Sequence, residues 1–329
     1  MWRSGALIRP CPSIASVTPP SLSPRTTAPG GHHVISPSRS ARGTASTGEL
    51  VSRDGTGLRT WTNGADGAPL VISNGLGAPP AAWPRLAEGG GFSAVSWSHR
   101  GLGGSERPDD PARISVVDHA ADLEATMDEA GFERAVLLGW SIGVDVAFEF
   151  ARAHPERVAG ILGIGGLPGG SFRAFGPPGQ PAAVREGLGR SAAWLLRLMG
   201  PPAAALAYPT VNLARALRVD HVAPLPDLAA SARVAREFTT HPWTWYSELL
   251  LAAGNHPPID TGFVSFPVTL VGGTLDIAVS AADIRAVTTT IPQARFVPLV
   301  GTHFLPLEQP DRLHQELIAL AERAGLLRT

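Results

Sequence analysis

The stretch that decides the fold is Arg134–Phe150, which reads R-A-V-L-L-G-W-S-I-G-V-D-V-A-F-E-F. The apolar run Ala135–Leu138 predicts a short buried strand, and the residues after Gly143 place alanines and large apolar side chains at helical spacing. Between the two, Ser141 is the centre of a Gly-x-Ser-x-Gly motif. A serine at a sharp strand-to-helix turn takes a strained backbone conformation that lifts its hydroxyl out of the sheet. The residues two before and two after it must be small, which fits Gly139 and Gly143.

Length and composition favour a soluble globular protein with one large domain, or one domain that carries an insertion. The chain has 329 residues, of which 44% are hydrophobic and 17% charged. The formal net charge of −1 gives no electrostatic basis for binding nucleic acid. The single cysteine, Cys11, excludes an internal disulfide and a cysteine-based zinc site, and it fits a cytoplasmic location. No uncharged apolar run reaches the roughly 18–20 residues that span a bilayer.

Residues 1–48 differ from the rest in composition. They are rich in Pro, Ser, Thr, Gly and Arg, and the first acidic residue is Glu49. The apolar run Ala6–Ile8 is too short for the core of a secretory signal. We predict a disordered tail without a catalytic role. A transit peptide and a start codon placed too early are the alternatives, so the role of the tail stays open.

The rest of the chain alternates strands and helices. Strands are expected at 58–62, 69–73, 92–98, 135–138, 158–164, 268–271 and 294–299, with 58–62 at the edge of the sheet. Helices are expected at 81–88, 115–131, 144–152, 281–290 and 311–326. This alternation predicts an α/β fold with a mostly parallel sheet covered by helices on both faces. The core is assigned to residues 49–166 and 267–329.

Between 167 and 266 the strand pattern stops. Helices are expected there at 181–199, 202–219, 228–239 and 243–253, with prolines between them. We interpret this region as a helical lid over the active edge of the sheet; ordinary helices that cover the sheet are the alternative. Its aromatic and large apolar residues either line a substrate pocket or form the interior of the lid. These residues are Trp194, Met199, Trp243, Trp245 and Tyr246.

A serine hydroxyl needs a base, and the base usually needs an acid that orients it. His303 follows the predicted strand 294–299, and Asp276 follows the predicted strand 268–271. The carboxyl ends of parallel strands meet at one edge of a sheet, so both side chains are expected near Ser141. The sequence therefore predicts a catalytic triad of Ser141, Asp276 and His303. Backbone amides of Leu76 and Ile142 are the predicted donors to an oxyanion.

These motifs resemble a known family over about residues 49–326. They are Asn74-Gly75, His99-Arg-Gly-Leu-Gly-Gly-Ser105, Gly-Trp-Ser-Ile-Gly around Ser141, Gly-x-x-Asp276, and His303. Together they are similar to the α/β-hydrolase superfamily, in its lid-bearing branch of esterases and lactonases. The resemblance implies the α/β-hydrolase fold, the triad roles above, and a supporting part for Asn74, Gly75, Gly139, Trp140 and Gly143.

Three positions qualify what the resemblance implies. Asn74 stands where relatives usually carry a histidine that supports the oxyanion loop, and Trp140 fills a position that varies among relatives. Haloalkane dehalogenases and epoxide hydrolases resemble this fold but use aspartate where this chain has Ser141. Those two activities are therefore not expected.

The predicted function is hydrolysis of an ester or related acyl bond in a small, hydrophobic substrate. A lactonase, a carbon–carbon bond hydrolase and a cofactor-free perhydrolase use the same triad and remain alternatives, as does a non-catalytic ligand-binding protein on this fold. A nucleotide-dependent enzyme is disfavoured. Gly89–Ala94 matches Gly-x-Gly-x-x-Ala, but it follows a predicted helix and precedes a predicted strand, whereas a phosphate-binding motif follows a strand and precedes a helix. We expect no cofactor, no metal, no nucleic-acid partner and no membrane span. Substrate identity and oligomeric state are left open.

Overall fold

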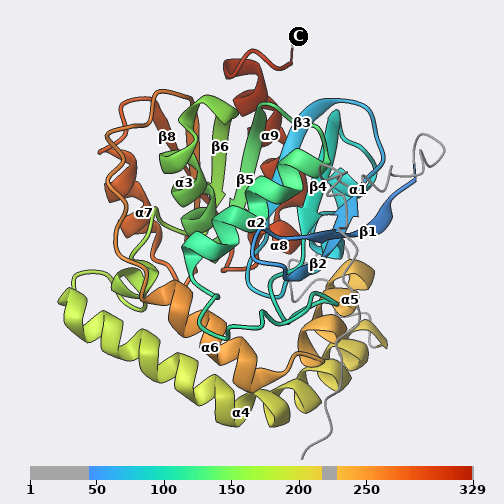
Figure 1. Cartoon of the computed structure of the whole chain (residues 1–329). Helices are drawn as coiled ribbons and strands as arrows, with labels where there is room; N and C mark the ends of the chain where they lie inside the picture. Colours follow the sequence, from blue (N-terminus) through green and yellow to red (C-terminus); the bar gives the residue numbers. More distant parts are fainter. Residues whose placement is uncertain (1–43, 217–227, 328–329) are drawn as a thin grey trace, which may run out of the picture. The chain divides into compact units, whose positions relative to one another are not determined.

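The computed structural model describes residues 44–216 and 228–327, except for the side chains of 201–216 and 228–230. An eight-stranded sheet has the order β1-β2-β4-β3-β5-β6-β7-β8 (Figure 1). The strands are β1 (Ser46–Val51), β2 (Gly57–Thr62), β3 (Ala68–Ser73), β4 (Phe92–Trp97), β5 (Ala135–Trp140), β6 (Val158–Ile164), β7 (Val268–Gly273) and β8 (Ala294–Leu299). β2 runs antiparallel to β1 and β4, and the pairings from β4 to β8 are all parallel.

Helices cover both faces of the sheet. The helices are α1 (Pro84–Ala87), α2 (Val116–Glu129), α3 (Ile142–Ala153), α4 (Ala182–Ala216), α5 (Leu228–Thr239), α6 (Trp243–Gly254), α7 (Ala281–Thr288), α8 (Leu305–Glu308) and α9 (Pro310–Arg323). In β5, Leu137 belongs to the core under α2, α3 and α7, whereas Val136 and Leu138 belong to the core under α1 and α9. The central strands are therefore apolar on both faces, as a parallel sheet between two helical layers requires. These findings confirm the predicted α/β-hydrolase architecture.

The strand register places several turns at one edge of the sheet. Ser73, at the end of β3, pairs with Gly139 of β5, and Ile164 of β6 pairs with Val271 of β7. Gly273 of β7 in turn pairs with Leu299 of β8. The segments that follow these strands therefore begin side by side.

The antiparallel edge of the sheet differs from the prediction. The predicted edge strand 58–62 lies in β2, inside the sheet, and the edge strand is β1, whose residues 46–48 had been assigned to the tail. Only Leu50 of β1 is buried, so this strand lacks the apolar alternation that reveals strands in a sequence. Residues 1–43 of the predicted tail lie outside the described residues.

Two helix boundaries in the predictions are wrong. Residues 182–216 form one continuous helix, α4, where a break was expected near Pro201, and the predicted end at 219 lies outside the described residues. A proline inside a helix costs roughly 3 kcal/mol, which packing can offset. Such packing is present: Trp243 of α6 lies so close to Gly200 that a Cβ there would come within 2.3 Å of its ring. The predicted helix 81–88 is divided at Trp83 into η1 (Pro80–Ala82) and α1.

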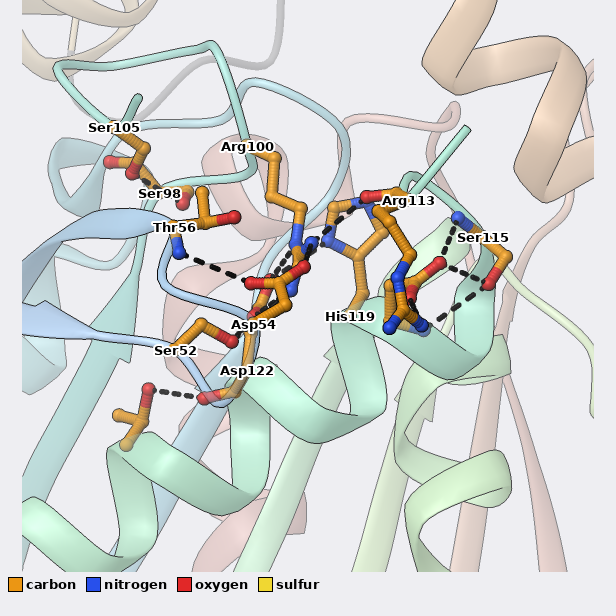
Figure 2. A network of polar contacts seen from close by, with 12 residues as sticks. Ser52, Asp54, Thr56, Ser98, Arg100, Ser105, Arg113, Ser115, His119 and Asp122 are labelled. Carbon is orange, nitrogen blue, oxygen red and sulfur yellow. Dashed lines mark hydrogen bonds and ion pairs between the residues drawn. The ribbon is translucent and has the colours of Figure 1, made fainter. Parts of the chain in front are cut away.

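A buried arginine in the loop after β4 forms hydrogen bonds with α2 and with the segment after β1 (Figure 2). Arg100 is 1% exposed, and its Nε and Nη2 each donate to a carboxylate oxygen of Asp122 in α2, both at 2.8 Å. Its Nη1 donates to the Arg113 carbonyl and to Asp54, which follows β1. Burial alone would raise the pKa of Asp122, but the hydrogen bonds and charge of Arg100 prevail and lower that pKa to about 2. The loop, α2 and the β1–β2 hairpin are thus held as one unit.

The helices α4, α5 and α6 gather beyond one end of the sheet in Figure 1. Two hydrogen bonds identify that end. The Trp245 indole of α6 donates to the Arg100 carbonyl at 2.8 Å, and the Tyr246 hydroxyl donates to the Leu76 carbonyl at 3.3 Å. Both carbonyls follow the carboxyl end of a strand, β4 and β3 respectively. Among the described helices, none is long and apolar enough to cross a bilayer.

Candidate active site

Ser141 lies in a strained turn between β5 and α3. Its φ of 56° and ψ of −123° make it the one described non-glycine residue with positive φ. Such a conformation costs on the order of 1–3 kcal/mol. Its amide donates to the Ile164 carbonyl at 2.8 Å, which ties the turn to β6.

The two glycines of the motif are required by close backbone contacts. A Cβ on Gly143 would lie 1.9 Å from the Ser73 carbonyl oxygen, and a Cβ on Gly139 would lie 2.7 Å from the Gly143 carbonyl oxygen. Neither neighbour is a flexible side chain that could give way. The turn therefore has its present geometry only with glycine at both positions.

The structure brings the side chains of Ser141, His303 and Asp276 together. His303 Nε2 lies 2.9 Å from Ser141 Oγ, and His303 Nδ1 lies 2.8 Å from Asp276 Oδ2. The Asp276 side chain is fully buried, and its Oδ1 accepts the amides of Ala278 at 2.8 Å and Val279 at 3.0 Å. With the carboxylate holding the proton on Nδ1, Nε2 is left to accept the serine proton. The imidazole is 20% exposed, so solvent reaches it.

Two further residues position the histidine, and sequence reasoning missed their contacts. The Trp140 indole, beside the serine, donates to the backbone carbonyl of His303 at 2.9 Å. Glu308 accepts the Thr302 amide at 2.6 Å and the Thr302 hydroxyl at 2.7 Å. Thr302 and Glu308 lie close together in the sequence, so their spacing could have indicated this contact. The Trp140 hydrogen bond joins positions far apart in the sequence, so no local pattern indicates it.

The turn after β3 holds the predicted oxyanion donor Leu76. Neither the Leu76 amide nor the Ile142 amide donates a hydrogen bond to another described residue. Asn74, which replaces the histidine of relatives, is buried; its amide donates to Ser96 at 2.7 Å, and its oxygen accepts the Trp83 indole at 2.6 Å. Both polar atoms of the Asn74 side chain therefore have a hydrogen-bond partner.

The five residues predicted to line a pocket do not share one environment. Trp194 and Met199 of α4 are 53% and 50% exposed, whereas Trp243, Trp245 and Tyr246 of α6 are buried. The buried three pack between elements: Trp243 against α4, Trp245 on the loop after β4, and Tyr246 on the turn after β3. Packing of the helical region accounts for their burial.

A second carboxyl group lies close behind the serine and was not predicted. Asp145, one turn into α3, is fully buried and accepts the Ser171 hydroxyl at 2.9 Å. Burial raises its pKa from 3.8 to about 8, and the bonds from Ser171 and the Gly169 amide offset only part of that effect. A sequence pattern cannot reveal this, because the effect depends on which surfaces cover the residue.

No cluster of three or more His, Cys, Asp or Glu side chains that could hold a metal ion occurs in the part of the chain that the structure describes.

Comparison with known proteins gives one family and several relatives. The family described as the alpha/beta hydrolase fold matches residues 68–310. "Epoxide hydrolase A" of Mycobacterium tuberculosis is 34% identical over 164 residues, 48% of this chain and 49% of that protein. "Putative carbamate hydrolase RutD" of Caulobacter segnis is 32% identical over 99 residues, 30% of this chain and 37% of that protein. The chain thus spans half or less of these relatives.

Solved structures show the same fold at lower identity. An enol-lactonase from Burkholderia xenovorans LB400 has a TM-score of 0.65 at 20% identity, with 84% of this chain and all of that chain covered. A thermophilic esterase from Thermogutta terrifontis has a TM-score of 0.63 at 21% identity, with 85% and 99% covered. At these identities the likeness establishes the fold.

Proposed function

Because the chain belongs to the α/β-hydrolase fold family, we propose that it is a serine hydrolase that cleaves an ester or related acyl bond of a small molecule. Ser141 is the nucleophile, His303 the general base and Asp276 the group that orients the histidine. The observation that carries the proposal is the continuous line of hydrogen bonds from Ser141 Oγ through His303 to Asp276, at 2.9 and 2.8 Å.

The geometry supports a two-step reaction. His303 Nε2 takes the hydroxyl proton as Ser141 Oγ attacks the acyl carbon, and His303 then returns that proton to the leaving group. An acyl-serine ester remains. His303 next takes a proton from water, the resulting hydroxide attacks the ester carbon, and the proton returns to Ser141 Oγ as the acid leaves.

The amides of Leu76 and Ile142, which have no acceptor among the described residues, are the proposed donors to the oxyanion that forms in each step. Ile142 follows Ser141 directly in the sequence. Leu76 lies in the turn after β3, the strand that pairs with β5. Loss of one such donor typically costs about 3–4 kcal/mol of transition-state stabilisation.

Residues 167–266 are proposed to act as a lid over this site, with the core in the segments before and after them. Support comes from α6, which touches the turns after β3 and β4. Large apolar side chains also flank the triad: Leu275 and Ile277 on either side of Asp276 and Phe304 after His303 are 63%, 82% and 49% exposed. This environment favours a substrate with an apolar part.

Epoxide hydrolysis is the second candidate, because a relative named for that activity is 34% identical over part of the chain. The nucleophile argues against it. Attack of Ser141 Oγ on an epoxide carbon would form an ether, which activated water does not cleave, whereas attack on an acyl carbon forms an ester that water does cleave. A lactone, a carbon–carbon bond next to a carbonyl and a peracid-forming reaction are all compatible with the same acyl chemistry.

A substrate panel with two variants tests the proposal. The panel holds p-nitrophenyl esters from acetate to dodecanoate, several lactones, and styrene oxide as the epoxide. We expect turnover of at least one ester or lactone, loss of at least 1,000-fold in kcat in both Ser141→Ala and His303→Gln, and no turnover of styrene oxide. Turnover of styrene oxide by the wild type would support the second candidate, and a folded wild type without any turnover would support a ligand-binding protein.

A further inference from the structure

Three successive carbonyl groups in the turn after β3 are each held by a separate donor. The Gly75 carbonyl accepts the Ala78 amide at 2.9 Å, a bond within the turn. The Leu76 carbonyl accepts the Tyr246 hydroxyl at 3.3 Å, and the Gly77 carbonyl accepts His241 Nε2 at 2.9 Å. The last two donors come from α6 and from the segment that precedes it, far along the chain. The Leu76 amide, between these carbonyls, donates a hydrogen bond to no other residue of the described chain.

The two distant donors form one buried aromatic unit. The His241 and Tyr246 rings stack with centroids 5.6 Å apart and planes 19° apart, and Phe238 of α5 packs edge-on against both at 5.4 Å. His241 is 8% and Tyr246 7% exposed. Burial raises the pKa of Tyr246 and lowers that of His241, so the phenol keeps its proton and the imidazole is neutral. A neutral imidazole with its proton on Nε2 donates to the Gly77 carbonyl.

The turn is also enclosed by rings. Gly77 has a φ of 68°, and a Cβ there would lie 2.3 Å from His241 Nε2. A Cβ on Gly75 would lie 3.0 Å from the ring of Trp140, the residue before the proposed nucleophile. The Trp140 ring lies against Gly75, and the His241 ring lies against Gly77. These rings leave the peptide groups of the turn little room to rotate.

We propose that Tyr246 and His241 are positioning residues that fix the peptide planes after the Leu76 amide and so keep this N–H directed at the developing oxyanion. The inference rests on the proposed function. Rotation of the Leu76–Gly77 peptide would break the bond to Tyr246, and rotation of the next peptide would break the bond to His241. The position of α5 and α6 is therefore coupled to the oxyanion donor, and a shift of these helices would weaken that donor.

The chain offers a closely matched pair of variants to test this. Tyr246→Phe removes a hydroxyl that donates to the Leu76 carbonyl. Ser247→Ala, at the next position of α6, removes a buried hydroxyl that donates to the Ala193 carbonyl at 2.7 Å, away from the turn. The two variants each lose one buried hydroxyl–carbonyl hydrogen bond, but only Tyr246→Phe loses a contact with the turn.

The readouts are kcat and KM on the best substrate, the inhibition constant of a trifluoromethyl ketone, and the melting temperature. A trifluoromethyl ketone forms a tetrahedral oxyanion with the serine, so its affinity reports on the donors directly. In Tyr246→Phe we expect kcat and inhibitor affinity to fall together by about 10-fold with KM within about 2-fold, less than the 100- to 1,000-fold typical of a lost donor. In Ser247→Ala we expect kcat and inhibitor affinity to stay within about 2-fold of the wild type.

His241 gives an independent arm if Tyr246→Phe folds poorly. His241→Ala loses the bond to the Gly77 carbonyl and should lower kcat, and His241→Gln, whose amide can donate to the same carbonyl, should restore part of it. Rates are expressed per site titrated with a fluorophosphonate, so that unfolded protein does not count. Equal kcat and inhibitor affinity in Tyr246→Phe and Ser247→Ala, with an active wild type, would overturn this inference alone. A folded wild type that neither turns over substrate nor takes the label would overturn the proposed function itself.

Discussion

Asp145 provides a quantitative prediction, because it is an acidic group enclosed by the protein close to the proposed nucleophile. Its side chain is fully buried, and it accepts hydrogen bonds from the Ser171 hydroxyl and from backbone amides. Burial raises its pKa from 3.8 to about 8. The perturbation is Asp145→Asn, which keeps the shape and an oxygen that can accept the Ser171 bond but removes the ionisation.

The sign and size of the effect follow from proton binding. Between the unfolded pKa of 3.8 and the folded pKa of about 8, the folded protein holds one more proton at Asp145 than the unfolded chain does. The contribution to stability is therefore complete below the lower pKa and is lost as pH rises through the upper one. Each pH unit is worth about 1.4 kcal/mol, so between pH 5 and 8 this group lowers the free energy of unfolding by about 4 kcal/mol.

Urea unfolding of wild type and Asp145→Asn at pH 5, 6, 7 and 8 measures this. We expect the variant to gain stability relative to the wild type as pH rises, with a difference that grows by about 4 kcal/mol over that range. Asp109→Asn, which removes an exposed carboxylate, is the matched control and should give a difference that does not change with pH. A flat difference for Asp145→Asn as well would refute the reasoning, since it would mean that the buried group ionises like an exposed one.

Three further predictions concern the turn, the loop after β4 and the triad. Gly143→Ala places a Cβ 1.9 Å from the Ser73 carbonyl oxygen, so the turn must move; we expect thermal unfolding to show a loss of at least 1–3 kcal/mol and kcat to be lost. Asp122→Asn leaves the guanidinium of Arg100 buried with a weakened partner, and chemical unfolding should show a loss of about 3–5 kcal/mol at neutral pH. Asp276→Asn should lower kcat by up to about 10,000-fold with little change in KM or in the circular dichroism spectrum, because the histidine loses the acceptor that fixes its tautomer; unchanged kcat would remove Asp276 from the mechanism.

The fold and the meeting of the triad side chains could be predicted because their determinants are local in the sequence. The Gly-x-Ser-x-Gly turn shows its steric requirement directly, as the contacts of Gly139 and Gly143 confirm. His303 and Asp276 were selected only because each follows a predicted parallel strand, and parallel strands end at one edge. The roles of these residues in catalysis remain predictions.

What sequence reasoning missed depends on contacts between distant segments. Only Leu50 of the edge strand β1 is buried, so the sequence of this strand shows no periodic apolar pattern. The local sequence at Pro201 predicts a helix break, but α4 continues through this position. Trp243, which is distant in the sequence, packs on the neighbouring Gly200. In the same way, the hydrogen bonds of Trp140 and Tyr246 to backbone carbonyls join segments that no sequence spacing brings together.

The most direct test of the central claim is the site at which a fluorophosphonate attaches. Trypsin should release residues 135–152 as one peptide, because Arg134 and Arg152 bound it, and Ser141 is the only serine in it. The account predicts one adduct per wild-type chain, on this peptide, with none in Ser141→Ala and a much slower reaction in His303→Gln. A folded wild type that stays unlabelled, or that carries the adduct on another peptide, would contradict it.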